Sequence, residues 1–323
     1  MLLKKNIFLL KITLDAIRDT FKIIKHFNLI KLNGPSIIVK LFFIRYFFSF
    51  NYLRNFFKIS KIVKNNANKD CNFLNDKHII NNEAVKDVDK FGYSKMFQIK
   101  EDQVDEIKKY VFDKNNINIK KNNKNKNDLL KKNHEDLNIY FKRLKEQNIS
   151  RFTGSVDLNK ESVLRNILFS DTIMEFARAY LNCNNFSVNA TFFVSNPLQI
   201  TEQEKYRNAQ YFHWDNDFRK FFKVYIYLTD VNSDSGPHIY IPGTHKNKLP
   251  EYKLCRLYPD SKVYADYPNP KVFTGKAGSL FMVDSYGLHK GETPKSKSRL
   301  MLNVHYGTGK ILYTENDEYV KLR

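Results

Sequence analysis

The chain has 323 residues, of which 42% are hydrophobic and 15% aromatic, and its formal net charge at pH 7 is +20. This composition excludes an intrinsically disordered chain, and the length can bury the core of one large or two ordinary domains. Its three cysteines, Cys71, Cys183 and Cys255, are odd in number and have no CxxC spacing. This excludes a disulfide framework and a cysteine-based zinc site, and it predicts a reducing, cytoplasmic environment.

The first 64 residues are strongly basic and strongly aromatic. They contain thirteen Lys or Arg and two Asp, a net charge of +11. Apolar residues recur there at the spacing of an amphipathic helix, at Leu14, Ile17, Phe21, Ile24 and Phe27. We expect residues 1–64 to form a helical extension that either packs on the rest of the chain or anchors it on an anionic membrane surface. Lys40 and Arg45 interrupt the next apolar run, so no uninterrupted run can span a bilayer.

Residues 65–90 are polar and of mixed charge, which is typical of a linker. A short strand is expected over Phe91–Ile99. An amphipathic helix is expected over Glu101–Val111, which has acidic residues in its first turn. The next stretch, 112–136, is rich in Lys and Asn with few apolar positions, and we expect a mobile insertion there.

The positive charge is concentrated in two stretches. Residues 108–133 contain nine Lys and two Asp, a net of +7, so this run and the first 64 residues together carry 18 of the 20 charges. An RNA-associated protein could use the 108–133 run. After Phe112, however, the run offers no aromatic side chain for base stacking, so nucleic-acid binding is not expected. An A/T-rich coding sequence explains the frequent Lys, Asn, Ile and Phe equally well.

A helix is predicted around Glu161–Leu181, after which the sequence changes to β-branched and aromatic runs bounded by Gly, Pro, Asn and Asp. These runs predict antiparallel strands at Asn185–Ser195, Phe222–Val231, His238–Ile241, Gly278–Val283 and Arg299–Tyr306. Helices followed by such strands indicate an α+β protein, with residues 311–323 as a C-terminal tail.

The most informative motif is His213-Trp214-Asp215, which is followed much later by His289. On an extended strand the side-chain period is two, so His213 and Asp215 point to the same side and can bind one metal ion. His289 from a neighbouring strand would complete a set of two imidazoles and one carboxylate. This set is the facial triad of non-haem Fe(II) oxygenases. Asp217 lies on the same strand face and is the alternative carboxylate if the register differs.

Arg299 follows His289 by ten residues, which would place it one turn and one strand further on. A guanidinium there could hold the distal carboxylate of a dicarboxylic acid with two hydrogen bonds. This arrangement predicts 2-oxoglutarate as co-substrate.

Two runs around these residues are more specific than the motif itself. Gln210–Lys246, which ends in P-G-T-H-K, and Gly275–Leu300, which contains G-S-L-F, closely resemble the phytanoyl-CoA dioxygenase (PhyH-like) family of Fe(II)/2-oxoglutarate-dependent oxygenases. A fainter resemblance begins at Phe91–Ile99, so the similarity covers roughly residues 88–307. It implies a dioxygenase domain over 91–310 with a double-stranded β-helix core, of the jelly-roll or cupin type, flanked by helices.

The resemblance also implies roles for the motif residues. His213, Asp215 and His289 would bind Fe(II), and Arg299 would bind the C5 carboxylate of 2-oxoglutarate. The expected reaction is hydroxylation of a small-molecule, lipid or glycan-linked substrate, with release of succinate and CO2. Halogenases of this type lack the carboxylate ligand, so the presence of Asp215 implies hydroxylation.

Neighbouring residues are expected to support the site. Gln210 and Tyr225 are candidates to hold the C1 carboxylate, because Trp214 stands where the phytanoyl-CoA hydroxylase has Gln and Gly291 offers no hydroxyl. Trp214 and His245, the latter in P-G-T-H, are expected in supporting positions outside the triad. Two further histidines, His238 and His305, are expected to be satisfied polar groups within strands.

Two other functions stay open: a non-catalytic cupin-like binding module, and a basic RNA-associated protein that uses 108–133. The joint presence of His213, Asp215, His289 and Arg299 favours an enzyme. We expect Fe(II) and 2-oxoglutarate as cofactors and a small molecule as the partner. The expected location is the cytoplasm, with membrane contact if the first 64 residues form an anchor.

Overall fold

The computed structural model describes residues 73–74, 82–113, 117–118, 135–184, 186–215, 220–252, 257–308 and 320–321. The expected extension over 1–64, most of the Lys/Asn-rich insertion, Asp217 and the tail apart from 320–321 lie outside the described residues. Within the described ranges, no helix has the length and hydropathy needed to cross a membrane.

Helices and antiparallel strands make up the described part of the chain. The helices are α5 (Asn82–Phe91), α6 (Glu101–Phe112), α7 (Leu137–Glu146), α8 (Val163–Leu168), α9 (Asp171–Leu181), α10 (Glu202–Arg207), the 3-10 turn η3 (Pro250–Tyr252) and α11 (Asp260–Asp266). The strands are β1 (Phe97–Gln98), β2 (Ile117–Asn118), β3 (Arg151–Val156), β4 (Ser187–Ser195), β5 (Phe212–His213), β6 (Phe221–Tyr227), β7 (His238–Tyr240), β8 (Leu257–Tyr258), β9 (Lys271–Phe273), β10 (Ser279–Val283), β11 (His289–Gly291), β12 (Arg299–Gly307) and β13 (Val320–Lys321).

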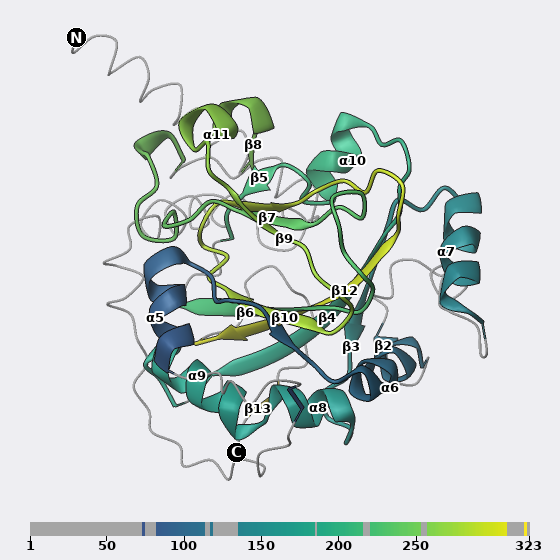
Figure 1. Ribbon diagram of the computed structural model, residues 1–323, viewed down its shortest axis with the longest axis horizontal. Coiled ribbons are helices and arrows are strands. Elements are labelled where there is room, and N and C mark those ends of the chain that lie inside the picture. The colour runs from purple at the N-terminus through teal and green to yellow at the C-terminus, as the bar shows by residue number, and fades with distance from the viewer. Residues whose placement is uncertain are drawn as a thin grey trace, which may run out of the picture.

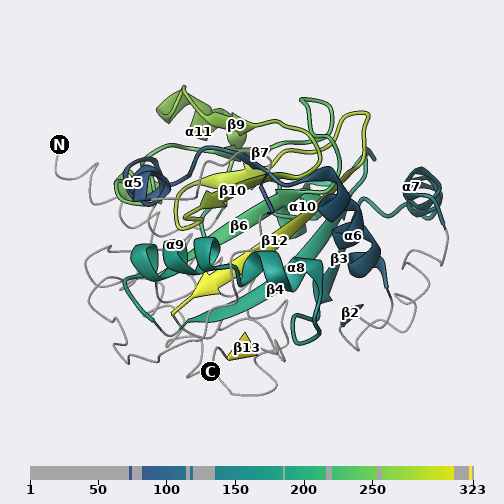
Figure 2. The same cartoon turned by 60° about the horizontal axis from the view of Figure 1, so that its bottom comes forward.

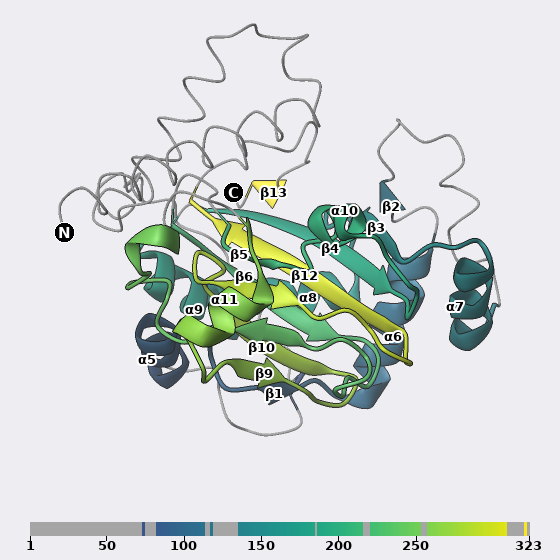
Figure 3. The ribbon, with the colours of Figure 1, turned by 90° about the horizontal axis from the view of Figure 1, so that it is seen from above.

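In the part of the chain that the structure describes, the strands form two antiparallel sheets that face each other (Figure 1). The larger sheet has the order β1-β10-β6-β12-β4-β3-β2, with β13 paired to β4, and the smaller has the order β8-β5-β11-β7-β9. From β5 onward the chain passes repeatedly between the sheets, so strands far apart in sequence become neighbours. Figure 3 shows the two layers from above, with α11 on the viewer's side, where its Val263 packs in the apolar cluster of the smaller sheet.

The main core lies on the outer face of the larger sheet. Alternate residues of β4 and β12 are apolar and buried there: Val188, Ala190, Phe192, Val194, Leu300, Leu302, Val304 and Tyr306. Helices α5, α6, α8 and α9 bury their apolar sides in the same cluster, and Figure 2 shows α8 and α9 across this face. Because side chains alternate along a strand, the intervening residues point inward, toward the smaller sheet.

The predicted helix over Glu101–Val111 is confirmed as α6, and strands occur near all five predicted positions. The single helix predicted around Glu161–Leu181 is wrong, because the chain breaks into α8 and α9 at Ser170. The Ser170 hydroxyl accepts a hydrogen bond from the Ile173 N–H at 3.5 Å and donates to the Ile167 carbonyl at 2.8 Å. It therefore caps the second helix and competes with continuation of the first.

The linker predicted over 65–90 includes most of helix α5. Ala84 and Val88, one helical turn apart, are fully buried. The Asp89 carbonyl also lies 2.9 Å from Nε2 of His245. The linker prediction is therefore wrong for residues 82–90, which pack on the domain.

Candidate metal centre

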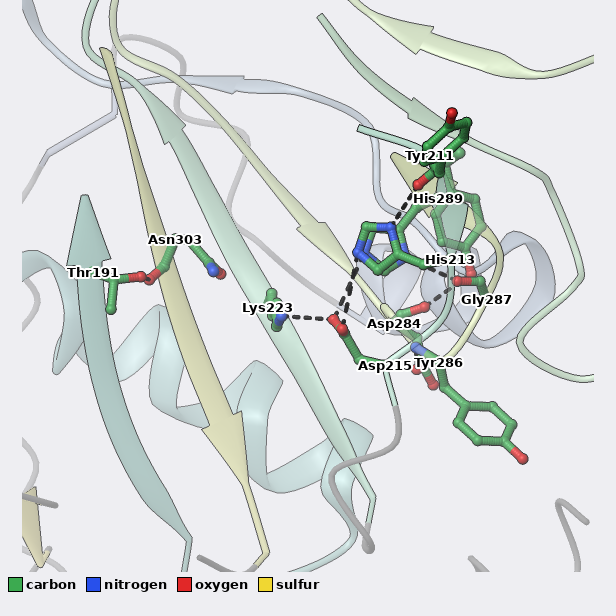
Figure 4. Close-up of polar contacts among 11 residues, drawn as sticks. Thr191, Tyr211, His213, Asp215, Lys223, Asp284, Tyr286, Gly287, His289 and Asn303 are labelled. Carbon is green, nitrogen blue, oxygen red and sulfur yellow. Dashed lines mark hydrogen bonds and ion pairs between the residues drawn. The ribbon is translucent and has the colours of Figure 1, made fainter. Parts of the chain in front are cut away.

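Strands β5 and β11 are neighbours in the smaller sheet and bring the two motif histidines together. His213 is paired in register with His289, and their ring centroids are 4.3 Å apart. Oxygens of the Asp215 carboxylate lie 4.0 Å from Nε2 of His213 and 3.6 Å from Nε2 of His289. One ligand atom from each residue lies within 4.8 Å of the others (Figure 4). The three residues predicted from the sequence therefore form one site.

Both imidazoles are held in the orientation that a metal ligand requires. Nδ1 of His213 lies 2.9 Å from the Tyr211 carbonyl, and Nδ1 of His289 lies 2.9 Å from the Gly287 carbonyl. A carbonyl oxygen only accepts, so each Nδ1 carries the proton and each Nε2 directs its lone pair toward the site. Such outer hydrogen bonds fix the tautomer and the ring orientation of metal-binding histidines.

The Asp215 carboxylate is paired with a cation from the larger sheet. Nζ of Lys223, on β6, donates to Oδ2 of Asp215 at 2.6 Å. Burial acts to raise the pKa of Asp215, but the charge of the adjacent Lys223 ammonium and its hydrogen bond lower it, and this pKa lies well below its usual range. Sequence reasoning missed Lys223; its one signal is that it is the sole charged residue within the apolar strand Phe221–Tyr227.

The donor set fits a divalent metal ion. Two imidazole nitrogens and one carboxylate oxygen suit first-row metals such as iron and leave coordination positions for other ligands. His213 and His289 are only 5% and 3% exposed, so an ion held there would be shielded from bulk water. No second group of this kind occurs among the residues that the structure describes.

Two guanidinium groups flank Ser195 on the inner face of the larger sheet. Ser195 is paired with Arg151 on β3 and with Arg299 on β12, so all three side chains point to the same face. Arg299 donates to the Gly236 carbonyl, but its buried Nε has no hydrogen-bond partner in the described ranges. Burial lowers the pKa of Arg299, and burial together with Arg299 lowers the pKa of Arg151 to about 10. A buried guanidinium beside a half-buried one favours an anionic ligand.

Tyr225 and Tyr227, on the inner face of β6, both interact electrostatically with Arg299. Burial raises the pKa of each phenol to about 12, so both stay protonated at neutral pH. The Tyr227 hydroxyl donates to the Phe273 carbonyl at 2.9 Å. Tyr225, predicted as a co-substrate residue, therefore lies on the same face as the guanidinium pair.

Residues 98–301 match the family model described as phytanoyl-CoA dioxygenase (PhyH). The chain belongs to the PhyH family. Among solved structures, it is similar to the non-heme alpha ketoglutarate dependent carbocyclase SnoK from nogalamycin biosynthesis (17% identity, TM-score 0.44, covering 70% of this chain and 83% of that one). It is also similar to HygX from Streptomyces hygroscopicus with nickel and 2-oxoglutarate bound (12% identity, TM-score 0.45, covering 70% and 87%). No curated protein matches the chain.

In this PhyH domain, Trp214, His245 and Gln210 contact other parts of the fold. Trp214 belongs to the apolar cluster of the smaller sheet and packs edge-on against Tyr286, with ring centroids 5.3 Å apart. This is the placement that the middle residue of His-x-Asp must have, because its side chain points away from its neighbours. Nε2 of His245 lies 2.9 Å from the Asp89 carbonyl of helix α5. Gln210 and Asp260 both line a cavity of about 510 Å³.

Gly291 and His238 are paired between β11 and β7, on the same strands as the His289–Tyr240 pair. A Cβ at Gly291 would lie 3.3 Å from Nη2 of Arg299, so the missing side chain lets the guanidinium approach.

The expectation that His238 is a satisfied polar group is wrong. Its buried Nε2 has no hydrogen-bond partner among the described residues, and burial lowers its pKa well below the usual range. His238 is therefore a neutral imidazole, with its ring centroid 5.5 Å from that of His289. His305 is buried and stacks on Phe221.

Proposed function

We propose that the protein is an Fe(II)- and 2-oxoglutarate-dependent dioxygenase that hydroxylates an unactivated C–H bond of a small-molecule, lipid or glycan-linked substrate. One observation carries the proposal: His213, Asp215 and His289 direct two Nε2 lone pairs and an ionised carboxylate to a common point. This ligand set is the one that non-haem iron oxygenases use. When bound there, Fe(II) would supply oxygen activation coupled to decarboxylation of 2-oxoglutarate to succinate and CO2. The carboxylate ligand supports hydroxylation rather than halogenation.

The chain's own residues would bind and orient the co-substrate. Arg299, assisted by Arg151 on the other side of Ser195, would hold the C5 carboxylate of 2-oxoglutarate. Nε of Arg299 has no acceptor among the described residues, which supports this role because a buried donor needs an acceptor. Tyr225 could donate a further hydrogen bond from its neutral phenol. Burial of these groups would strengthen each contact and limit access of water.

We also infer that the two facing sheets form a double-stranded β-helix. The order of the strands supports this topology. The chain alternates between the two sheets through β5, β6, β7, β10, β11 and β12. The exception is that β7 is followed by β8 and β9 of the same sheet.

The test is formation of succinate from 2-oxoglutarate by the purified protein with Fe(II) and oxygen, without added substrate. We expect slow, iron-dependent succinate formation that Asp215→Ala abolishes. The matched control is Asp217→Ala, which removes the alternative carboxylate of the same motif and should retain activity. Activity that survives in Asp215→Ala but is lost in Asp217→Ala would assign the ligand to Asp217 instead. A wild type that binds Fe(II) and forms no succinate contradicts the proposed reaction.

A further inference from the structure

The inner face of the larger sheet has two ends with different chemistry. Arg299 begins β12, and Tyr227, which interacts with it, ends β6. Lys223 lies four residues before Tyr227, about 13 Å away along the strand. In the proposed function, 2-oxoglutarate extends from Arg299 to the metal. The Lys223 end of the face is then the side left for the substrate.

Across β12, β4 and β3, in register with Tyr225 and Lys223 of β6, the inner face carries a strip of short, uncharged polar side chains. His305 separates Lys223 from Asn189 across the strands, and Thr191 pairs with both Asn303 and Ser155. The alternate residues of the same strands are apolar and lie in the core. Figure 4 shows Thr191 and Asn303 on neighbouring strands beside Lys223. The polar strip consists of the half-buried residues Ser155, Asn189, Thr191 and Asn303.

Asn303 gives the polar strip an acceptor that lacks a donor. Its Oδ1 is buried and has no hydrogen-bond partner in the described part of the chain. Thr191, beside it, donates its hydroxyl to the Asn303 backbone carbonyl at 3.2 Å. A buried acceptor without a donor is unfavourable, so Asn303 favours a ligand group that donates, such as a hydroxyl. A hydrocarbon chain laid over the strip would leave this oxygen unsatisfied.

The charges at the metal end favour an acidic ligand. The Lys223 side chain is only 14% exposed and shares the Asp215 carboxylate with any ion that the triad binds. A dication and the Lys223 ammonium bring three positive charges. The Asp215 carboxylate and one carboxylate of 2-oxoglutarate bring two negative charges. The excess of one positive charge in a largely buried place is unfavourable unless an anion neutralises it.

We infer that the substrate is an acidic, hydroxylated molecule. Its carboxylate or phosphate pairs with Lys223, and its hydroxyl groups bind to the polar strip. The inference rests on the proposed function and deepens it by naming the substrate class. A sugar acid or a sugar phosphate has this chemistry, whereas a simple fatty-acyl chain does not.

The test measures binding of two probe pairs, by calorimetry, to protein loaded with Ni(II) and 2-oxoglutarate, in which no turnover occurs. Gluconate is compared with glucitol, and glucose 6-phosphate with glucose, so the two pairs distinguish a carboxylate from a phosphate. We expect the acidic member of at least one pair to bind about ten-fold more tightly or better, as a charge-assisted hydrogen bond implies. Lys223→Met should remove this preference and Lys223→Arg should retain it. The matched control is Lys276→Met, which removes an 82% exposed lysine paired with Asp230.

Three results would overturn the inference: equal binding within both pairs, no saturation by either acidic probe at roughly ten millimolar, or a preference that survives in Lys223→Met. Asn303→Asp provides a second variant of nearly equal shape, and its added negative charge should weaken the acidic probes selectively. The affinity of Lys223→Met for 2-oxoglutarate is measured in the same protein, and a loss of about ten-fold or more would assign Lys223 to the co-substrate instead. If Fe(II) and 2-oxoglutarate do not bind together at all, the proposed function fails and not only its substrate class.

Discussion

Replacing Arg151 with Met should lower the affinity for 2-oxoglutarate without lowering the stability of the fold. The pKa of Arg151 falls from 12.5 to about 10, and one pKa step corresponds to about 1.4 kcal/mol, so the charged side chain costs the fold about 3 kcal/mol. Met removes this cost. It also removes the hydrogen bond to the Asn208 carbonyl and the cation–π contact with Phe193, which together contribute about 1–2 kcal/mol. We therefore expect the metal-free protein to be unchanged or about 1–2 kcal/mol more stable.

The same substitution should weaken 2-oxoglutarate binding, because Arg151 assists Arg299 in holding an anion. Loss of one charge-assisted hydrogen bond corresponds to about 1.5–3 kcal/mol, or about ten- to one-hundred-fold in affinity. Urea denaturation of the metal-free protein measures the first effect, and anaerobic titration with Fe(II) and 2-oxoglutarate measures the second. A variant that is about 3 kcal/mol less stable but binds 2-oxoglutarate as well as wild type would refute this reasoning.

Three further predictions follow from particular contacts. In Gly287→Ala, the new Cβ would lie 1.9 Å from the Tyr240 hydroxyl. Urea denaturation should show a free energy of unfolding that is lower by about 1–3 kcal/mol. Metal titration should show weaker binding, because the Gly287 carbonyl orients His289. Hydrogen bonds from Tyr252 and Lys262 lower the pKa of Asp266. The stability that these bonds give the folded protein is therefore present above the ordinary Asp pKa of about 3.9 and is lost as the pH falls through the lowered value. In denaturation experiments, Asp266→Asn should be less stable than wild type at neutral pH, and the difference should disappear near pH 2. Metal affinity measured by calorimetry should fall as the pH is lowered, because protonated imidazoles cannot be ligands. An affinity that is constant from about pH 5 to 8 would argue against histidine ligation.

The sequence predicted the metal centre better than the strands that build it. The period of a strand was enough to place His213 and Asp215 on one side, and the ligand chemistry together with the resemblance pointed to His289 and Arg299. Strands β5 and β11, which carry the two histidines, have only two and three residues. Strands this short contain no periodic signal, so their pairing could not be predicted from the sequence alone.

Lys223 and Arg151 were missed because their roles depend on register between distant strands. Arg151 reaches Arg299 only because β3 and β12 both pair with β4 at Ser195. Lys223 reaches Asp215 across the two sheets. The break at Ser170 is a different case: its sequence signal, a serine just before Asp171, was present, but the apolar spacing continued through it.

The central claim is that His213, Asp215 and His289 bind Fe(II) together with 2-oxoglutarate. The most direct measurement is the visible absorption of the anaerobic protein as Fe(II) and then 2-oxoglutarate are added, with His213→Ala and His289→Ala as controls. The account predicts a metal-to-ligand charge-transfer band in the wild type that neither variant forms. A folded wild type without this band, or an undiminished band in both variants, would contradict it.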